Sequence, residues 1–183
     1  MTQLRMEKDD LENVPHIPVP PGYLLRNYRE GDEAGIGRVY AGASLGNETA
    51  EDVRRRIITH ECFKPERLFV IEHAGELVGT SAAWIEAEAD PGVGYLHMIG
   101  VVPEHRGKRL GAILTIAAIR YSRSEGFTRQ RLSTDDWRDA AICLYLDLGY
   151  YPLLVDEAHR ARWEILARKL DHVSALARAK VLR

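Results

Sequence analysis

Apolar residues along this chain follow two different spacings, and their order predicts a domain that mixes strands with helices. Short apolar runs of strand length occur at residues 23–26, 68–72, 76–84, 95–102, 130–134 and 150–155. Apolar residues recur at helical spacing within residues 36–40, 51–60, 110–121 and 139–148, and again from residue 159 onward. Because hairpin-linked strands and strand–helix–strand units both occur, we expect an α/β domain built on a mixed sheet.

The two ends of the chain differ from this central pattern. Residues 1–21 are charged and then rich in proline, which fixes φ and disfavours helix, so we expect an extended arm that is laid over a neighbouring surface or disordered. Residues 22–183 then form a single domain that includes a C-terminal helix. The apolar stripe of that helix, at Trp163, Leu166 and Leu170, predicts packing against the domain or against a second subunit, so a homodimer is one expectation.

Composition narrows the class of protein. A length of 183 residues suits one domain, and a formal net charge of −2 gives no basic field for nucleic acid or an anionic membrane. No apolar run reaches the roughly 18 residues that span a bilayer, and the N-terminus lacks the apolar segment of a signal peptide. Two distant cysteines, Cys62 and Cys143, form no metal-binding spacing, so we expect no metal and a reducing, cytoplasmic location.

The most informative stretch is the turn between the strand predicted at 95–102 and the helix that begins at Leu110. Pro103 ends the strand because proline cannot donate to a sheet ladder. The first backbone amides of a helix have no partner inside it and lie at the positive end of its dipole. A basic turn that bears a glycine and leads into such a helix is therefore a good seat for a pyrophosphate. A plain strand-to-helix connection with solvated basic residues is the alternative.

Two common phosphate-binding motifs do not fit this turn. A P-loop requires a Lys-Ser/Thr pair, which the turn lacks, and a dinucleotide fingerprint requires G-x-G-x-x-G, which Gly107 and Gly111 do not supply. A nucleotide-binding switch is therefore disfavoured.

Residues 101–111, read as Val-x-Pro-x-x-Arg-Gly-x-x-Leu-Gly, resemble the acetyl-CoA signature of the GNAT superfamily of N-acetyltransferases. The resemblance implies the GNAT fold, with a mixed, mostly antiparallel central sheet and helices on both faces. It also implies acetyl-CoA as co-substrate, with its pyrophosphate held by backbone amides of the turn and the helix. The residues expected to bind the coenzyme are Ile99, Val101, Val102, Arg106, Gly107, Lys108, Arg109, Leu110, Gly111 and Ala112.

The chain departs from the family signature at Arg109, where the family usually has glycine. The outer positions of that signature, Arg106 and Gly111, still match. Arg109 keeps its backbone N–H, so we expect coenzyme binding to survive there if its φ is negative.

A second stretch, residues 141–150, resembles a later GNAT motif, A-x-x-L-Y-x-x-x-G-[FY], which closes the coenzyme site. Within it, Tyr145 matches the family tyrosine that sits near the thioester sulfur. A phenol with an ordinary pKa of about 10 holds its proton at neutral pH, so we expect Tyr145 to act as the general acid toward the leaving thiolate. A tyrosine that only packs against the preceding helix is the alternative. Many family members have asparagine where this chain has Arg138, so no coenzyme contact is transferred to Arg138.

In the family, the general base is often a carboxylate or histidine on the signature strand, or a water chain. His97 is the candidate here because a pKa near 6.5 suits proton removal near neutrality, and a structural, hydrogen-bonded histidine is the alternative. Strand alternation puts His97 on the same face as Tyr95, Ile99 and Val101. The resemblance also implies that a backbone N–H near Val101 stabilises the oxyanion. Glu86, Glu88 and Asp135 are weaker candidates for the base, and Thr134 and Asp135 are candidates for contact with the acceptor.

Together these features predict an enzyme that moves the acetyl group of acetyl-CoA to a primary amine by direct attack in a ternary complex. Its expected partners are the coenzyme and an amine acceptor, with neither nucleic acid nor membrane. A non-catalytic module that binds or senses acyl-CoA is the alternative. Nothing in the sequence identifies the acceptor.

Overall fold

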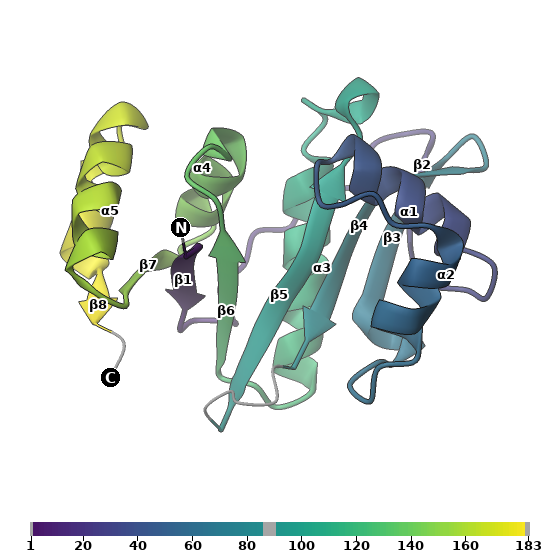
Figure 1. Ribbon diagram of the computed structural model, residues 1–183, viewed down its shortest axis with the longest axis horizontal. Coiled ribbons are helices and arrows are strands. Elements are labelled where there is room, and N and C mark those ends of the chain that lie inside the picture. The colour runs from purple at the N-terminus through teal and green to yellow at the C-terminus, as the bar shows by residue number, and fades with distance from the viewer. Residues whose placement is uncertain (1, 86–90, 182–183) are drawn as a thin grey trace.

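The computed structural model describes residues 2–85 and 91–181 and arranges them as one mixed sheet between two layers of helices (Figure 1). The strands are β1 (Leu4–Lys8), β2 (Tyr23–Asn27), β3 (Leu68–His73), β4 (Glu76–Trp84), β5 (Val93–Val101), β6 (Arg129–Thr134), β7 (Tyr151–Leu154) and β8 (Lys180–Val181). The helices are α1 (Glu33–Gly42), α2 (Ala50–Val53), α3 (Leu110–Ser124), α4 (Asp139–Asp147) and α5 (Glu157–Lys169), with shorter turns η1 (Arg54–Ile58), η2 (Pro65–Arg67), η3 (Pro103–His105) and η4 (Val173–Arg178).

The strands follow the order β2-β3-β4-β5-β6-β1-β7-β8 across the sheet. Neighbouring strands are antiparallel except for the pairs β5–β6 and β7–β8, which are parallel. The expected mixed, mostly antiparallel sheet is therefore confirmed.

Two apolar clusters hold helices against the two faces of this sheet. One cluster joins α1, α2 and η1 to β3, β4 and β5, with Ile36, Tyr40 and Val70 among its most buried members. The other joins α3, α4 and α5 to the opposite side of the strands, with Ile119 and Trp163 almost fully buried. Burial of these apolar surfaces is the main force that fixes the two layers.

The segment before Tyr23, which we expected to form an extended arm, is extended but contributes a strand to the interior of the sheet. β1 pairs antiparallel with both β6 and β7. Leu4 and Met6 on this strand are fully buried. The buried carboxylate of Glu7 accepts hydrogen bonds from Arg131 Nε (2.6 Å) and from the Tyr151 hydroxyl (2.8 Å). These partners make it possible to bury a charge in the middle of the sheet.

Two helix ends depart from the simplest reading of the sequence. The C-terminal helix does not continue to the end of the chain, because α5 stops at Lys169 and is followed by η4 and β8. Asp32 lies at the N-cap of α1, but its carboxylate makes no capping bond there. It binds the guanidinium of Arg26 at 2.7 and 2.9 Å, and a charge-assisted pair of bonds to arginine is stronger than a neutral capping bond.

Candidate functional site

Strands β5 and β6 lie side by side for only part of their length. They pair in parallel at three positions, from Val93–Arg129 to Tyr95–Arg131. Beyond Tyr95 the two strands diverge, as Figure 1 shows, while β5 stays paired with β4 on its other side. The part of β5 that follows Tyr95 therefore has one edge of its backbone turned toward an opening in the sheet.

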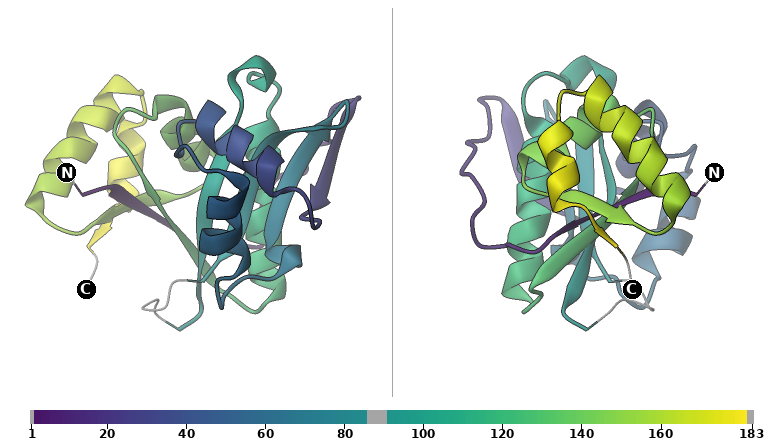
Figure 2. Two further views of the ribbon diagram at one scale, coloured as in Figure 1. Left: turned by 45° about the vertical axis from the view of Figure 1, so that its right-hand side comes forward. Right: turned by 90° about the vertical axis from the view of Figure 1, so that its left-hand side faces the viewer.

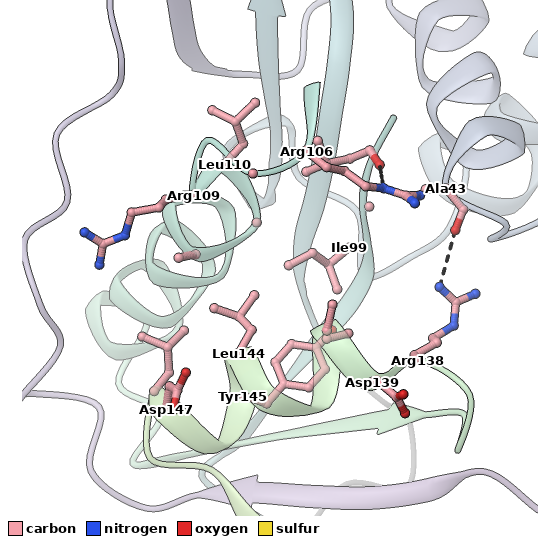
Figure 3. Close-up of a pocket in the computed structure, with 18 of the residues that line it drawn as sticks. Ala43, Ile99, Arg106, Arg109, Leu110, Arg138, Asp139, Leu144, Tyr145 and Asp147 are labelled. Atoms are coloured by element: carbon pink, nitrogen blue, oxygen red, sulfur yellow. Dashed lines mark hydrogen bonds between the residues drawn. The ribbon is translucent and has the colours of Figure 1, made fainter. Parts of the chain in front are cut away.

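A pocket of about 750 Å³ fills this opening (Figure 3). Its walls come from β5, the turn into α3, the first part of α3, one side of α4, the residues that follow α1, and the segment that precedes β2. Of the residues that the sequence predicted for the coenzyme, those that line it are Ile99, Val101, Arg106, Gly107, Arg109, Leu110, Gly111 and Ala112. Tyr145 lines the same pocket from α4, so the two sequence motifs meet in one place.

The N-terminus of α3 is open toward this pocket. The first backbone bond of the helix runs from the N–H of Ile113 to the carbonyl of Arg109 (3.1 Å), and no side chain caps the helix. The amides of Leu110, Gly111 and Ala112 precede that bond and have no acceptor inside the helix. With the positive end of the helix dipole behind them, these amides form a site suited to an anion.

Hydrogen bonds from the basic side chains of Arg106 and Lys108 hold the turn that leads into α3. Arg106 donates from Nε to the carbonyl of Val101 (3.1 Å) and from Nη2 to the carbonyl of Gly42 (3.4 Å). Lys108 donates to the carbonyl of Glu104 (3.4 Å) and does not line the pocket. Val102 does not line it either, and its N–H is bonded to the carbonyl of Val78 on β4 (3.0 Å). Lys108 and Val102 thus shape the turn without lining the pocket, whereas Arg106 does both.

Arg109 adopts a left-handed backbone, with φ of 60°, so the condition of a negative φ is not met. The turn thus keeps the conformation that suits the family glycine, even though an arginine occupies the position. Its side chain is exposed and extends away from Tyr145 in Figure 3. The backbone amides therefore stay accessible to a bound phosphate, while the left-handed backbone of Arg109 is locally strained.

Replacing Arg109 with glycine is expected to raise the free energy of unfolding by about 1 kcal/mol, because a left-handed backbone is unfavourable for any residue with a Cβ. Urea denaturation without ligand measures this change. The control is Lys108→Gly, one residue earlier, where the backbone is not left-handed and glycine should lower stability. A loss of stability in Arg109→Gly would contradict the prediction.

Tyr145 is 4% exposed, and its ring packs edge-on against Tyr150 at 5.8 Å between centroids. Burial raises the pKa of the Tyr145 hydroxyl well above its ordinary value of 10, so the group keeps its proton at any physiological pH. No hydrogen bond joins this hydroxyl to another residue that the structure describes. A protonated, unengaged phenol at the wall of the pocket can donate to a ligand there.

His97 does not face the same pocket as Ile99 and Val101, so the alternation expected along this strand was wrong. β5 contains a bulge in its pairing with β4, and Met98 there has a φ of 47°. A bulge inserts one residue and so turns the following side chains to the other face. His97 instead lines a cavity of about 90 Å³ beneath α1 and η1, and its ring stacks on Trp84 at 5.6 Å.

Burial lowers the pKa of His97 from 6.5 to about 4, with the positive charge of Arg56 adding to the effect. The folded state thus favours neutral imidazole, so its contribution to stability is complete above pH 6.5 and is lost as the pH falls toward 4. Lowering the pH from 7 to 5 is expected to reduce the free energy of unfolding by about 2 kcal/mol through this group. Urea denaturation at both pH values, for the parent and for His97→Gln, isolates this term. An equal loss in both proteins would contradict the prediction.

Of the remaining candidates for the base and the acceptor contact, Thr134 and Asp135 lie outside the large pocket. Thr134 is buried at the end of β6, and its hydroxyl has no hydrogen-bond partner among the described residues. Asp135 accepts bonds from Arg138 Nε (3.2 Å) and from Gln3 Nε2 (3.1 Å). Glu86 and Glu88 fall outside the residues that the structure describes.

One wall of the pocket contains residues to which sequence reasoning gave no role there. The guanidinium of Arg138 donates to the carbonyls of Ala43 (3.3 Å) and Ser44 (2.5 Å), so it links the end of α1 to the start of α4. The same guanidinium lies 4.2 Å over the ring of Trp137, which is 63% exposed at the rim. Pro15 and Ile17 line the pocket from the segment before β2. No local signal marks these residues, because they meet the pocket only through the fold.

Within residues 2–85 and 91–181, no three histidine, cysteine or acidic side chains gather as metal ligands would. None of the helices in those ranges is long and apolar enough to cross a membrane.

Comparison with known proteins connects this geometry to one family. A family model described as "Acetyltransferase (GNAT) family" matches residues 28–150. The mycothiol acetyltransferase of Thermobispora bispora is 34% identical over 165 residues, covering 85% of this chain and 56% of the relative. That of Thermomonospora curvata is 30% identical over 167 residues, covering 88% and 54%. The chain thus spans about half the length of the curated relatives it matches.

Solved structures share the fold. A GCN5-related N-acetyltransferase from Sphaerobacter thermophilus superposes with a TM-score of 0.66 at 22% identity, over 83% of this chain and 49% of the other. A tandem GNAT protein from the clavulanic acid biosynthesis pathway gives 0.61 at 21% identity, over 82% of this chain and 50% of that one.

Proposed function

Because this chain belongs to the acetyltransferase (GNAT) family, we propose that it transfers the acetyl group of acetyl-CoA to a primary amine by direct attack in a ternary complex. One observation carries the proposal: the open amides of α3 and the hydroxyl-bearing ring of Tyr145 face a single pocket. An anionic coenzyme with a reactive thioester requires an anion site and a proton donor in the same pocket.

The coenzyme fits this pocket in one direction. Its pyrophosphate lies on the amides of Leu110, Gly111 and Ala112, where backbone donors and the helix dipole favour negative charge. The pantetheine arm then runs inward along the edge of β5 that faces the opening in the sheet. This direction brings the thioester to the part of the pocket that Ile99 and Tyr145 line.

The chemistry follows from that placement. The neutral amine attacks the thioester carbonyl carbon, a C–N bond forms, and negative charge develops on the carbonyl oxygen, where a backbone N–H near Val101 stabilises it. The C–S bond then breaks, and Tyr145 gives its proton to the departing sulfur, while the new nitrogen loses a proton to water. Solvent returns a proton to the tyrosinate. The products are an acetamide and free coenzyme A.

His97 has no place in this scheme. It lines the separate cavity behind the bulge of β5, and burial lowers its pKa to about 4, which makes it a weak base at neutral pH. The amine therefore reaches the pocket already neutral, and the rate should rise with pH until the free acceptor amine is deprotonated.

The acceptor enters on the side that Ala43, Ser44 and Trp137 line. Figure 3 shows Ala43 and Arg138 on the other side of the pocket from Arg109 and Asp147. The exposed ring of Trp137, fixed by Arg138, gives this entrance an aromatic face. Because the matching relatives are named mycothiol acetyltransferases, a mycothiol-related amine is the first acceptor to test.

Thermal unfolding with acetyl-CoA, coenzyme A and ATP tests the coenzyme site. A ligand at about 100 times its dissociation constant adds roughly 2.7 kcal/mol to the stability of the folded state. Both coenzyme forms should raise the melting temperature and ATP should not. Release of free thiol from acetyl-CoA in the presence of amines then measures transfer. Binding without turnover on any amine would favour a sensing module, and no shift with either coenzyme form would overturn the proposal.

A further inference from the structure

The segment between β1 and β2, residues 9–22, crosses the molecule as a strap. β1 lies between β6 and β7, whereas β2 forms the far edge of the sheet, so the strap passes over β6, β5, β4 and β3. It runs along the outside of α3, as the right-hand view of Figure 2 shows. Both of its ends are fixed by sheet pairing, which makes the strap a permanent part of the domain.

Bonds to α3 and apolar contacts hold the strap in place. Arg120 on α3 donates to the carbonyl of Pro15 (3.3 Å), and Arg123 pairs with Glu12 (3.5 Å). Leu11 is 3% exposed, and three other strap residues pack against the core: Val14, Ile17 and Val19. Four prolines further restrict its backbone, so little conformational entropy is left to lose when a ligand binds.

Two strap residues reach the large pocket. Pro15, whose ring is exposed, and the half-buried Ile17 are part of its wall. In Figure 3 the strap passes on the side of Arg109 and Asp147, away from Ala43 and Arg138. The strap thus borders the coenzyme side of the pocket, and the acceptor side lies at the other end.

The direction in which coenzyme A lies in the pocket indicates which part of it contacts this wall. If the pyrophosphate rests on the start of α3 and the pantetheine arm runs inward toward Tyr145, the adenosine end must extend outward from the helix. On that side the pocket offers the apolar surfaces of Pro15 and Ile17. A purine is flat and weakly hydrated on its faces, so it gains by packing on such surfaces.

We propose that Pro15 and Ile17 hold the adenosine end of coenzyme A, so that the strap, and not only the turn before α3, binds the coenzyme. The inference rests on the proposed function, because it takes its ligand and direction from there.

The test compares coenzyme A with 4′-phosphopantetheine, which keeps the arm and one phosphate but lacks the adenosine. Titration calorimetry measures both dissociation constants for the parent, Pro15→Ala and Ile17→Ala. We expect each substitution to raise the constant for coenzyme A roughly 5- to 10-fold, since each removes part of an apolar contact, and to leave that for 4′-phosphopantetheine within twofold. The matched control is Val19→Ala, a half-buried residue of the same strap outside the pocket, which should change neither constant.

Each other outcome counts against the proposal. If Ile17→Ala and Pro15→Ala bind coenzyme A as tightly as the parent does, the strap has only a structural role. Equal weakening of both ligands, or weakening by Val19→Ala as well, would mean that the strap acts through the shape of the whole domain. If the parent itself binds neither ligand, the proposed function fails first, and the strap inference fails with it.

Discussion

Replacing Tyr145 with phenylalanine is expected to lower kcat about 100-fold while the KM for acetyl-CoA changes less than about twofold, since a general acid contributes roughly 10²–10⁴-fold. The hydroxyl has no hydrogen-bond partner among the residues described, so its loss leaves the packing of the ring intact. The proton donor acts only as the C–S bond breaks, and so its removal affects the transition state more than binding. Steady-state rates with a saturating amine measure the effect.

The matched control is Tyr121→Phe. Tyr121 lies on α3 outside the pocket, and its hydroxyl donates to Glu125 (3.2 Å). The same chemical change there should leave kcat within about twofold of the parent. Tyr145→Phe with parental kcat would mean that the thiolate leaves without help from this residue, and Tyr145 would then be only a packing residue.

Replacing Gly111 with aspartate is expected to weaken coenzyme A binding at least about 100-fold, without loss of stability. A Cβ at this position meets only the Leu144 side chain, at 3.4 Å, which is ordinary contact. The added carboxylate lies in the first turn of α3, where it stabilises the helix by about 0.3–1 kcal/mol. The same carboxylate occupies and repels the place of the pyrophosphate, since two like charges 4 Å apart repel by about 4 kcal/mol near a protein surface.

The neutral variant Gly111→Asn separates charge from bulk. It adds a side chain of almost the same size, so it should weaken binding far less than aspartate does. Thermal unfolding checks that both variants are folded, and calorimetry gives both dissociation constants. Parental affinity in Gly111→Asp would mean that the phosphates lie elsewhere, and equal weakening in both variants would assign the effect to bulk.

The two motifs could be predicted from sequence because each is a local pattern. Residues 101–111 specify a strand, a turn and a helix start over one short stretch, and α4 carries Tyr145 at a fixed offset from the following glycine. Once the fold places α4 next to the end of β5, both motifs line the same pocket.

The position of His97 and the backbone of Arg109 both depart from local preference, and for a shared reason. Alternation along β5 assumes regular pairing, and the bulge at Met98 reverses it through a contact with β4 that the strand's own sequence does not encode. The left-handed backbone of Arg109 likewise opposes the residue's own preference, and the surrounding turn imposes it.

The positions of the strap and of β1 could not be predicted from the sequence, for a different reason. Alternating apolar residues at Leu4 and Met6 are too few to predict a strand, and prolines at 15–21 indicate only an extended chain. Their partners stand more than a hundred positions away. Only the assembled sheet shows that this segment fills a central place and borders the pocket.

The central position of β1 also affects how the molecule folds. Glu7 and its partner Arg131 are 124 positions apart, so this part of the sheet closes only through contacts that are distant in sequence. Until β1 is seated, β6 and β7 have no neighbour between them, and the groups that β1 would pair with are open to strands of other chains. Pairing of β1 protects β6 and β7 from intermolecular association. Substitutions that weaken the pairing of β1 should therefore both slow refolding and increase aggregation after dilution from denaturant.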